Sequence, residues 1–140
     1  MRIVAIDYGK KRCGLAVTDP LKIIATHLNT TETSQLISFL KAYCLSNEVE
    51  GFVLGKPLKL NNELNAISQD IEALKRVLSA QFPEKYIDDI DERFTSKIAT
   101  QSILMSGVNK KKRQDKSTVD MVSAVIILQN YLELKNKYHE

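Results

Sequence analysis

The sequence predicts a mixed α/β fold in which helices cover both faces of a single sheet. Three short runs of apolar and β-branched residues follow one another near the amino terminus, two more strand-like runs each follow a helical pattern, and the chain ends in two helical segments. Strands this close together are joined by hairpins, whereas strands separated by a helix pair in parallel through right-handed crossovers. We therefore expect a five-stranded sheet with three antiparallel strands followed by two parallel ones.

Turn residues and the hydrophobic period place the individual elements. Gly9 and the Asp19-Pro20 pair indicate the two hairpin turns. The apolar period then becomes helical, and the threonines within 30–33 are available as helix N-caps. Phe82-Pro83 ends the second helix, and Gly107 ends the third. The expected order is strands at 2–7, 13–18 and 22–28, a helix spanning 36–44, a strand at 51–55, a helix at 63–80, a strand at 86–91, and helices at about 95–107 and 116–135.

Length and composition fit a single domain over residues 1–140. A chain of 140 residues with 44% hydrophobic and 26% charged residues can bury one core, and this composition is not that of a disordered chain. No apolar run approaches the roughly 18 to 20 residues of a membrane span, and the first residues do not resemble a signal peptide, so we expect a cytoplasmic protein. Cys13 and Cys44 lie far apart without a CxxC motif, which predicts reduced thiols.

Carboxylates mark three positions where metal chemistry is possible. Asp7 ends a buried strand, which is a ligand position in open α/β sheets, although an Asp in this setting also caps its own turn. Four carboxylates occur within 88–92, and their repulsion calls for Arg93, a nearby lysine or a divalent cation, unless this is a solvated edge strand. Asp120 lies in a nearly all-apolar helix, where it needs a partner across an interface or pairs with Lys116 one turn earlier.

Basic residues gather in two segments. Lys10, Lys11 and Arg12 follow the first strand, and the run 110–113 precedes Lys116. Beside a carboxylate cluster these residues would hold phosphates, whereas a charge run by itself is commonly a solvated loop.

Other enzyme classes lack their motifs in this chain. GxSxG, GxGxxG and GxxxxGK[ST] do not occur, which argues against serine hydrolases and dinucleotide or P-loop sites. His27 and His139 are the two histidines, and both are poorly placed as bases for a catalytic triad. The first phosphate motif of actin-like kinases has some similarity to the segment 7–17, but such kinases need two domains of this kind.

Five short motifs occur in order along nearly the whole chain. They are Ile6-Asp7-Tyr8-Gly9, Arg12-x-Gly14-Leu15-Ala16-Val17-Thr18-Asp19, Val53-Leu54-Gly55-x-Pro57, Asp91-Glu92-Arg93-Phe94-Thr95-Ser96 and Lys116-x-x-x-Asp120. Together they resemble the YqgF/RuvX family, which comprises small bacterial proteins with an RNase H-like, Holliday-junction-resolvase-like fold that are described as pre-16S rRNA nucleases.

The resemblance implies a metal-dependent nuclease that hydrolyses phosphodiester bonds in 5′-end processing of precursor 16S rRNA during ribosome biogenesis. The catalytic and metal-binding carboxylates would be Asp7, Glu92 and Asp120, with Mg²⁺ or Mn²⁺ as the cofactor. The nucleic-acid-binding residues would be Arg12, Arg93 and Lys116, to which the basic run adds Lys110, Lys111, Lys112 and Arg113. A Holliday-junction-resolvase-like DNA endonuclease and a non-catalytic nucleic-acid-binding module remain the alternatives, and no membrane partner is expected.

The resemblance also implies a sheet order and exposes three departures from the family pattern, one of which is Ser123 in place of the first small, alanine-type residue after the helix aspartate. In that order one strand separates the strands that lead to Asp7 and Glu92, which puts their backbones about 9 to 10 Å apart. Lys56 replaces the usual apolar residue before Pro57, where it would add a phosphate contact. Asp88-Asp89 make the last strand more acidic than the family pattern and leave its pairing open.

Overall fold

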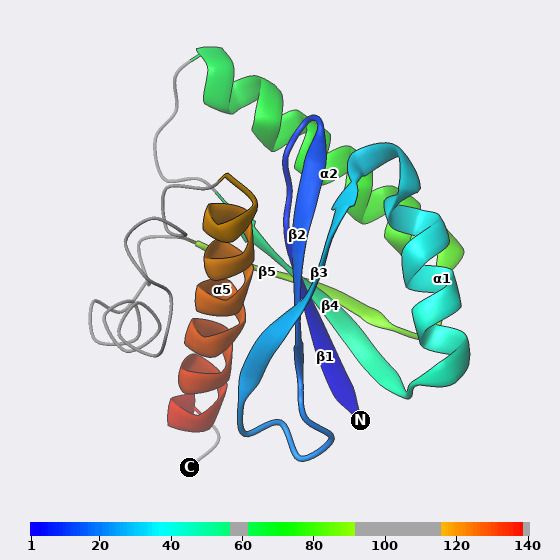
Figure 1. The fold of residues 1–140 in the computed structure, drawn as a ribbon, viewed down its shortest axis with the longest axis vertical. Helices are drawn as coiled ribbons and strands as arrows, with labels where there is room; N and C mark the ends of the chain where they lie inside the picture. Colours follow the sequence, from blue (N-terminus) through cyan, green and yellow to red (C-terminus); the bar gives the residue numbers. More distant parts are fainter. Residues whose placement is uncertain (57–61, 92–115, 139–140) are drawn as a thin grey trace.

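The computed structural model describes the backbone of residues 1–56, 62–91 and 116–138, and the side chains of 1–56, 66–90 and 123–135. Its elements are β1 (Arg2–Asp7), β2 (Arg12–Thr18), β3 (Ala25–Glu32), η1 (Thr33–Gln35), α1 (Leu36–Ser46), β4 (Val49–Lys56), α2 (Asn62–Gln81), β5 (Tyr86–Asp91) and α5 (Lys116–Tyr138). The five strands form one sheet with helices on both faces, which confirms the predicted fold class (Figure 1).

The sheet has the order β3-β2-β1-β4-β5, with antiparallel pairing among β1 to β3 and parallel pairing of β1 with β4 and of β4 with β5. The carboxyl ends of the three parallel strands therefore meet at one edge. Ile6 pairs with Leu54, and Leu54 pairs with Asp89. The following residues, Asp7, Gly55 and Ile90, consequently stand in one row across that edge.

One face of the sheet packs against α1 and α2. Leu36 and Leu40 of α1 and Ile71 and Leu78 of α2 are buried against strand residues of this face. Among these strand residues is Phe52, whose ring also meets the edge of the Phe82 ring at 5.0 Å between centroids. The helices predicted for these two segments are confirmed.

The opposite face packs against α5. The buried apolar residues described in this helix recur at spacings of three and four, as expected for a helix lying on a sheet: they are Ala124, Ile127, Leu128, Tyr131 and Leu132. A Cβ at Gly55 would lie only 2.6 Å from Cδ1 of Ile127. The glycine therefore lets α5 approach the carboxyl end of β4 closely.

The third strand differs from its prediction at both ends. The Asp19 carboxylate accepts hydrogen bonds from the backbone N–H groups of Leu21, Ile23 and Ile24, and the left-handed Lys22 (φ 60°) completes a turn where a strand was expected. The strand begins at Ala25 and continues to Glu32.

The predicted threonine N-caps are wrong. Thr30 and Thr31 lie in β3, paired with Gly14 and Cys13 of β2. Within the described part of the chain, neither η1 nor α1 receives a capping hydrogen bond from a side chain. Thr33 instead makes contacts with the β1–β2 turn.

The remaining elements lie close to their predicted bounds, and β5 matches its predicted bounds throughout. The predicted helix at about 95–107 falls outside the described residues. Cys13 is buried and Cys44 partly buried, and neither forms a disulfide, as predicted. A search of the described helices finds none with the length and apolarity that crossing a membrane requires.

Candidate active site

Asp7 stands at the carboxyl end of β1. Its neighbours Ile6 and Tyr8 pack into the core on the α1 and α2 side, whereas Ala5 packs on the α5 side. Because side chains alternate along a strand, Asp7 lies on the α5 face. Its side chain is half-buried, in the same row as Gly55. Asp7 is therefore a carboxylate at the sheet edge, under the helix that carries Asp120.

The start of α5 lies at the same end of the molecule as the β1–β2 turn (Figure 1). Asp120 precedes Ala124 by one helical turn and Ile127 by two, and both of these residues pack on the sheet. The backbone of Asp120 therefore continues the sheet-contacting stripe of α5 toward its first residues. The side chains of Lys116 and Asp120 lie outside the described residues.

The third predicted carboxylate, Glu92, lies outside the described residues, as do Arg93 and the basic run 110–113. Glu92 directly follows Asp91, the last residue of β5. One strand, β4, separates β5 from β1, as the resemblance implied. Two strand spacings correspond to about 9 to 10 Å between the backbones of β1 and β5.

Basic side chains flank Asp7 on the β1–β2 turn. Only four residues separate Asp7 from Arg12, the first residue of β2. Lys10 and Lys11 are exposed, and Arg12 is half-buried opposite Glu32 of β3. This arrangement brings three consecutive positive charges to the carboxyl end of β1.

Tyr8 adds a neutral polar group to this edge. Burial, together with the nearby carboxylate of Asp70 and the thiol of Cys13, raises the pKa of the Tyr8 phenol above its ordinary value of 10.0. The phenol therefore keeps its proton at neutral pH and can act as a hydrogen-bond donor.

The acidic strand β5 finds its partners in lysine and tyrosine side chains. Asp89 accepts a 2.6 Å hydrogen bond from Lys75 and pairs with Lys56 at 3.3 Å, and Asp88 accepts a hydrogen bond from the Tyr131 hydroxyl. Burial alone would raise the pKa of Asp89, but the two lysines outweigh it and lower the pKa. A nearby lysine, one of the partners expected for this run, is therefore present among the described residues, whereas Arg93 lies outside them.

Lys56 forms its ion pairs within the protein. It pairs with Glu72 at 3.1 Å as well as with Asp89, and both contacts lie on the α2 side of the sheet. The phosphate contact predicted for it stays a prediction. In the described portion of the chain, no three His, Cys, Asp or Glu side chains converge as a metal site.

Two residues that shape this edge of the sheet were not predicted from the sequence. Gly55 was quoted only as part of a motif, and its contact with Ile127 depends on a helix more than 60 residues away. Thr33 was expected to cap a helix, yet its hydroxyl donates a 2.6 Å hydrogen bond to the carbonyl oxygen of Gly9. Neither contact has a local sequence pattern, because each joins segments distant in the chain.

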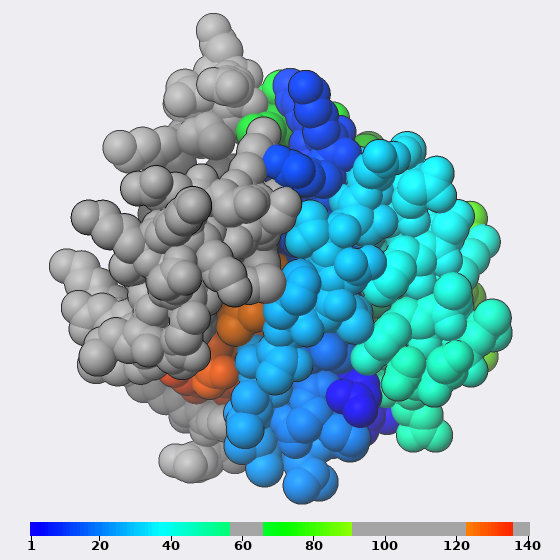
Figure 2. Space-filling model, in the orientation of Figure 1, coloured from blue at the N-terminus to red at the C-terminus, as the bar shows by residue number. Residues whose placement is uncertain are grey.

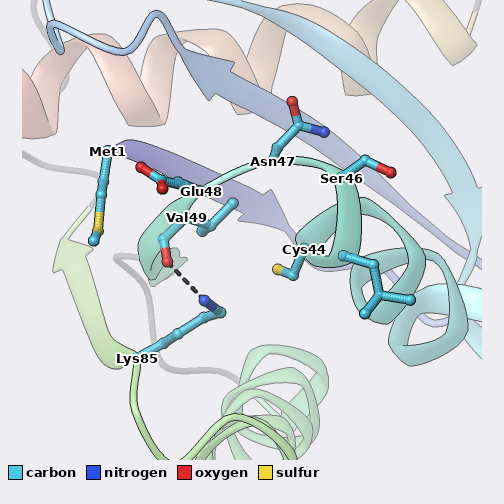
Figure 3. A pocket seen from close by; sticks show the side chains of 8 residues that line it. Met1, Cys44, Ser46, Asn47, Glu48, Val49 and Lys85 are labelled. Atoms are coloured by element: carbon cyan, nitrogen blue, oxygen red, sulfur yellow. Dashed lines mark hydrogen bonds between the residues drawn. The ribbon is translucent and has the colours of Figure 1, made fainter.

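The other end of the sheet holds a cavity of about 310 Å³. Its lining includes Met1, Cys44, Glu48 and Lys85, and Lys85 donates a 2.7 Å hydrogen bond to the carbonyl oxygen of Val49 (Figure 3). Met1 precedes β1 and Asp7 ends it, so about 20 Å of strand separates this cavity from Asp7. We therefore do not assign the cavity to the candidate active site.

Comparison with known proteins decides the family. The model of the family described as "RuvX: Holliday junction resolvase" matches residues 1–134. The chain belongs to the RuvX family. A Porphyromonas gingivalis relative is 52% identical over 132 residues, covering 94% of this chain and 96% of its own. A Bacteroides thetaiotaomicron relative is 47% identical over 134 residues, covering 96% of this chain and 97% of its own. Both relatives carry the name "Putative pre-16S rRNA nuclease".

Solved structures show the same fold at low sequence identity. Thermus thermophilus RuvC in complex with a Holliday junction substrate gives a TM-score of 0.60 with 12% identity, covering 96% of each chain. The fowlpox virus Holliday junction resolvase gives 0.57 with 12% identity, covering 96% of this chain and 99% of its own. This RuvX-family chain therefore has the RNase H-like fold of RuvC.

Proposed function

We propose that this RuvX-family chain is a metal-dependent nuclease that hydrolyses phosphodiester bonds in precursor 16S rRNA. The main support for this proposal is the position of Asp7. It is a half-buried carboxylate at the carboxyl end of β1, on the face of the sheet that α5 covers, and the basic residues Lys10, Lys11 and Arg12 follow it closely in the chain. The names of relatives at 47% and 52% identity support precursor 16S rRNA as the substrate. Its site of action would be the cytoplasm, where this RNA is made, and residues 1–140 would act as one domain.

Asp7, Glu92 and Asp120 are the residues that would hold Mg²⁺ or Mn²⁺. The donor set fits such a cation, because carboxylate oxygens are the ligands that hard divalent ions prefer. The position of Asp7 also suits a metal ligand, because its side chain is partly buried and lies at the carboxyl ends of the parallel strands. Bound divalent cations supply charge stabilisation for the attacking and leaving oxygens of a phosphodiester.

The protein's own basic residues would bind and orient the substrate. Arg12 and the lysines beside it would contact phosphates at the Asp7 end of the sheet. The other contacts are assigned to residues outside the described side chains: Arg93, Lys116, Lys110, Lys111, Lys112 and Arg113. A non-catalytic binding module would need these cations but not three carboxylates, so the presence of all three favours an enzyme.

A four-way DNA junction is the second candidate substrate. The description of the matching family names a Holliday junction resolvase, and this favours the alternative. RNA and DNA share the phosphates that basic residues contact, so the two substrates have to be distinguished by experiment.

The test incubates the purified full chain with end-labelled precursor 16S rRNA and, separately, with a synthetic four-way DNA junction. Each reaction contains Mg²⁺, Mn²⁺ or EDTA. Cleavage of the rRNA at defined positions, abolished by EDTA, is the expected result. Cleavage of the junction alone would replace the substrate assignment, and no cleavage of either substrate with either metal would contradict the nuclease proposal.

A further inference from the structure

The β1–β2 turn, residues 8–11, is held at two points by Thr33. The Thr33 hydroxyl donates a 2.6 Å hydrogen bond to the carbonyl oxygen of Gly9, and the Thr33 N–H donates a 3.0 Å hydrogen bond to the carbonyl oxygen of Lys11. These two carbonyls flank Lys10. The Thr33 hydroxyl also lies 3.5 Å from the thiol sulfur of Cys13. One residue at the start of η1 therefore fixes the backbone on both sides of an exposed lysine.

The turn itself leaves little room for movement. A Cβ at Gly9 would lie only 2.4 Å from the carbonyl oxygen of Arg12, so a side chain does not fit there. In the space-filling view the turn projects beside the segment that leads into α1 (Figure 2). The backbone between Asp7 and Arg12 is thus closed tightly on itself and held from outside by Thr33.

We propose that the β1–β2 turn is a preformed phosphate clamp in which Lys10 and Lys11 contact the substrate backbone and Thr33 is their positioning residue. This inference rests on the proposed nuclease function and assigns residues to its substrate path. The two lysines lie within four residues of Asp7, in a turn bonded to the segment that leads into α1. The nucleic acid would therefore pass from the Asp7 edge across the turn.

Preorganisation explains why a threonine held in this way matters for binding. Long lysine side chains lose conformational entropy when they bind phosphate, and a mobile turn would add the cost of ordering its backbone. The two hydrogen bonds from Thr33 fix that backbone before the substrate arrives. The hydroxyl bond is part-buried, which protects it from competition with water.

The test compares Thr33→Val with wild type in binding to a labelled RNA fragment of precursor 16S rRNA across a salt series. Valine keeps the shape and the N–H but removes the hydroxyl. We expect the Kd to rise about three- to tenfold and the slope of log K against log salt to become shallower by about one unit. Thr33→Ser restores both values. The Lys10→Ser/Lys11→Ser variant makes the slope shallower by up to about two units.

A double-mutant cycle separates positioning from a structural role. If Thr33 acts through the lysines, Thr33→Val adds little to the Kd of Lys10→Ser/Lys11→Ser, whereas independent effects would add. Thr26→Val is the matched control, because the Thr26 hydroxyl also donates a part-buried hydrogen bond, of 3.4 Å, to a backbone carbonyl, that of Val17 at the other end of β3. Lys41→Ser is the control for one exposed charge. Both controls should bind like wild type.

Additive effects in the cycle, or a Thr33→Val slope equal to that of wild type, would overturn this inference alone. Failure of the wild-type chain to bind the RNA would overturn it together with the proposed function. Circular dichroism and thermal melting of every variant show whether it folds. If Thr33→Val does not fold, the proposal is tested with Lys10→Ser/Lys11→Ser and Thr33→Ser instead. A Lys10→Ser/Lys11→Ser variant that binds RNA with the wild-type salt slope contradicts the clamp.

Discussion

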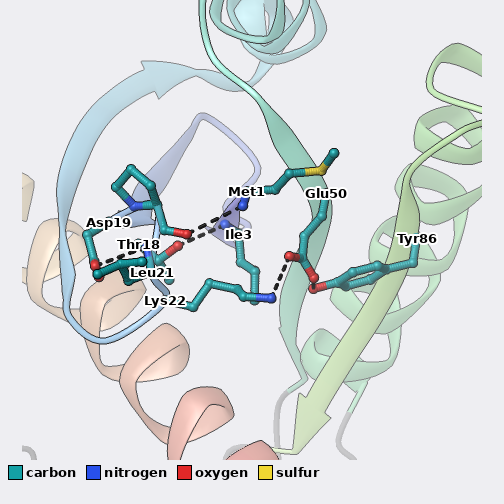
Figure 4. A network of polar contacts seen from close by, with 9 residues as sticks. Met1, Ile3, Thr18, Asp19, Leu21, Lys22, Glu50 and Tyr86 are labelled. Carbon is teal, nitrogen blue, oxygen red and sulfur yellow. Dashed lines mark hydrogen bonds and ion pairs between the residues drawn. The ribbon is translucent and has the colours of Figure 1, made fainter.

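The two ends of the sheet use their charged residues differently. At the amino end, Lys22 pairs with Glu50 at 2.8 Å, and Glu50 also accepts a 3.0 Å hydrogen bond from the Tyr86 hydroxyl (Figure 4). At the carboxyl end, the consecutive residues Lys10 and Lys11 are exposed beside Asp7. Lys22 and Glu50 at the amino end are paired within the protein, whereas the turn at the other end presents like charges to solvent. We propose that this contrast separates residues that hold the fold from residues that meet a ligand.

The largest expected effect on activity comes from substituting Asp7 at the carboxyl end of the sheet, and the substitution of Asp19 at the amino end is its counterpart. Asp7→Asn keeps the shape of the side chain but removes the charge that a divalent cation needs, so the cleavage rate should fall about a thousandfold. The melting temperature should stay the same or rise, because the three proposed metal ligands would repel one another in the absence of a cation and the change relieves that repulsion. Single-turnover cleavage and thermal melting measure the two quantities.

Asp19→Ala should behave in the opposite way. It removes the acceptor for the backbone N–H groups of Leu21, Ile23 and Ile24, so the melting temperature falls while the folded protein cleaves at the wild-type rate. If Asp7→Asn cleaves at the wild-type rate, Asp7 is not a metal ligand. If Asp19→Ala loses activity at temperatures where it is folded, the two ends are not separate.

Gly55→Ala tests how closely α5 must approach the Asp7 edge. The new methyl group would meet Cδ1 of Ile127, and such overpacking costs about 1 to 3 kcal/mol in the free energy of unfolding. A small displacement of α5 also moves Asp120, so cleavage should fall by up to about a hundredfold. Urea denaturation and single-turnover rates check both effects.

The compensating change for Gly55→Ala lies on α5. Ile127→Val removes the Cδ1 methyl that the new side chain would meet, so the double variant should recover stability relative to the sum of the two single changes. Strict additivity of the two losses would mean that Gly55 does not set the approach of α5.

The fold was predictable because its signals are local. Alternating or continuous apolar runs mark the strands, and the Asp19-Pro20 and Phe82-Pro83 pairs mark two ends of elements. The third strand was predicted too early in the chain, because Ile23 and Ile24 resemble strand residues in type but are exposed, at 63% and 58%. Their backbone N–H groups bind the Asp19 carboxylate, which a pattern of hydrophobicity does not reveal.

The candidate site was predictable only in part. Asp7 could be found because it ends an apolar strand, and the motif at Asp120 could be found by resemblance. The contact of Thr33 with Gly9 joins residues 24 positions apart, and the partners of Asp89 come from α2 and β4. Such contacts depend on how distant segments pack, so residue types and spacing carry little information about them.

At the amino end, Glu50→Gln should make stability less sensitive to acid. Burial would raise the pKa of Glu50, but hydrogen bonds from Lys22 and Tyr86 outweigh it and lower the pKa below its ordinary value of 4.5. A carboxyl group with a lowered pKa stabilises the folded state above pH 4.5, and this contribution is lost as the pH falls through the lowered pKa. Glu50→Gln should therefore be less stable than wild type at pH 7, and the gap should narrow below pH 4.5.

Urea unfolding at pH 7 and at successively lower pH values measures that gap. Glu48→Gln is the matched control, because Glu48 is an exposed neighbour on the same segment. A gap between Glu50→Gln and wild type that stays constant with pH would contradict the role given to the Lys22, Glu50 and Tyr86 contacts.

The smallest expected effect is that of Lys56→Met. Lys56 is paired within the protein but lies at the carboxyl end of the sheet, where Lys10 and Lys11 are exposed to solvent. Lys56 pairs with Glu72 and Asp89, but its side chain is 40% exposed, and pairs of this kind contribute less than about 1 kcal/mol. Asp89 also keeps its 2.6 Å contact with Lys75, so the variant leaves no carboxylate unpaired there. We expect a small loss of stability that shrinks further in high salt, measured by urea unfolding, and an unchanged salt slope of RNA binding. A slope shallower by about one unit would instead place a phosphate on Lys56 and make it part of the ligand-binding end.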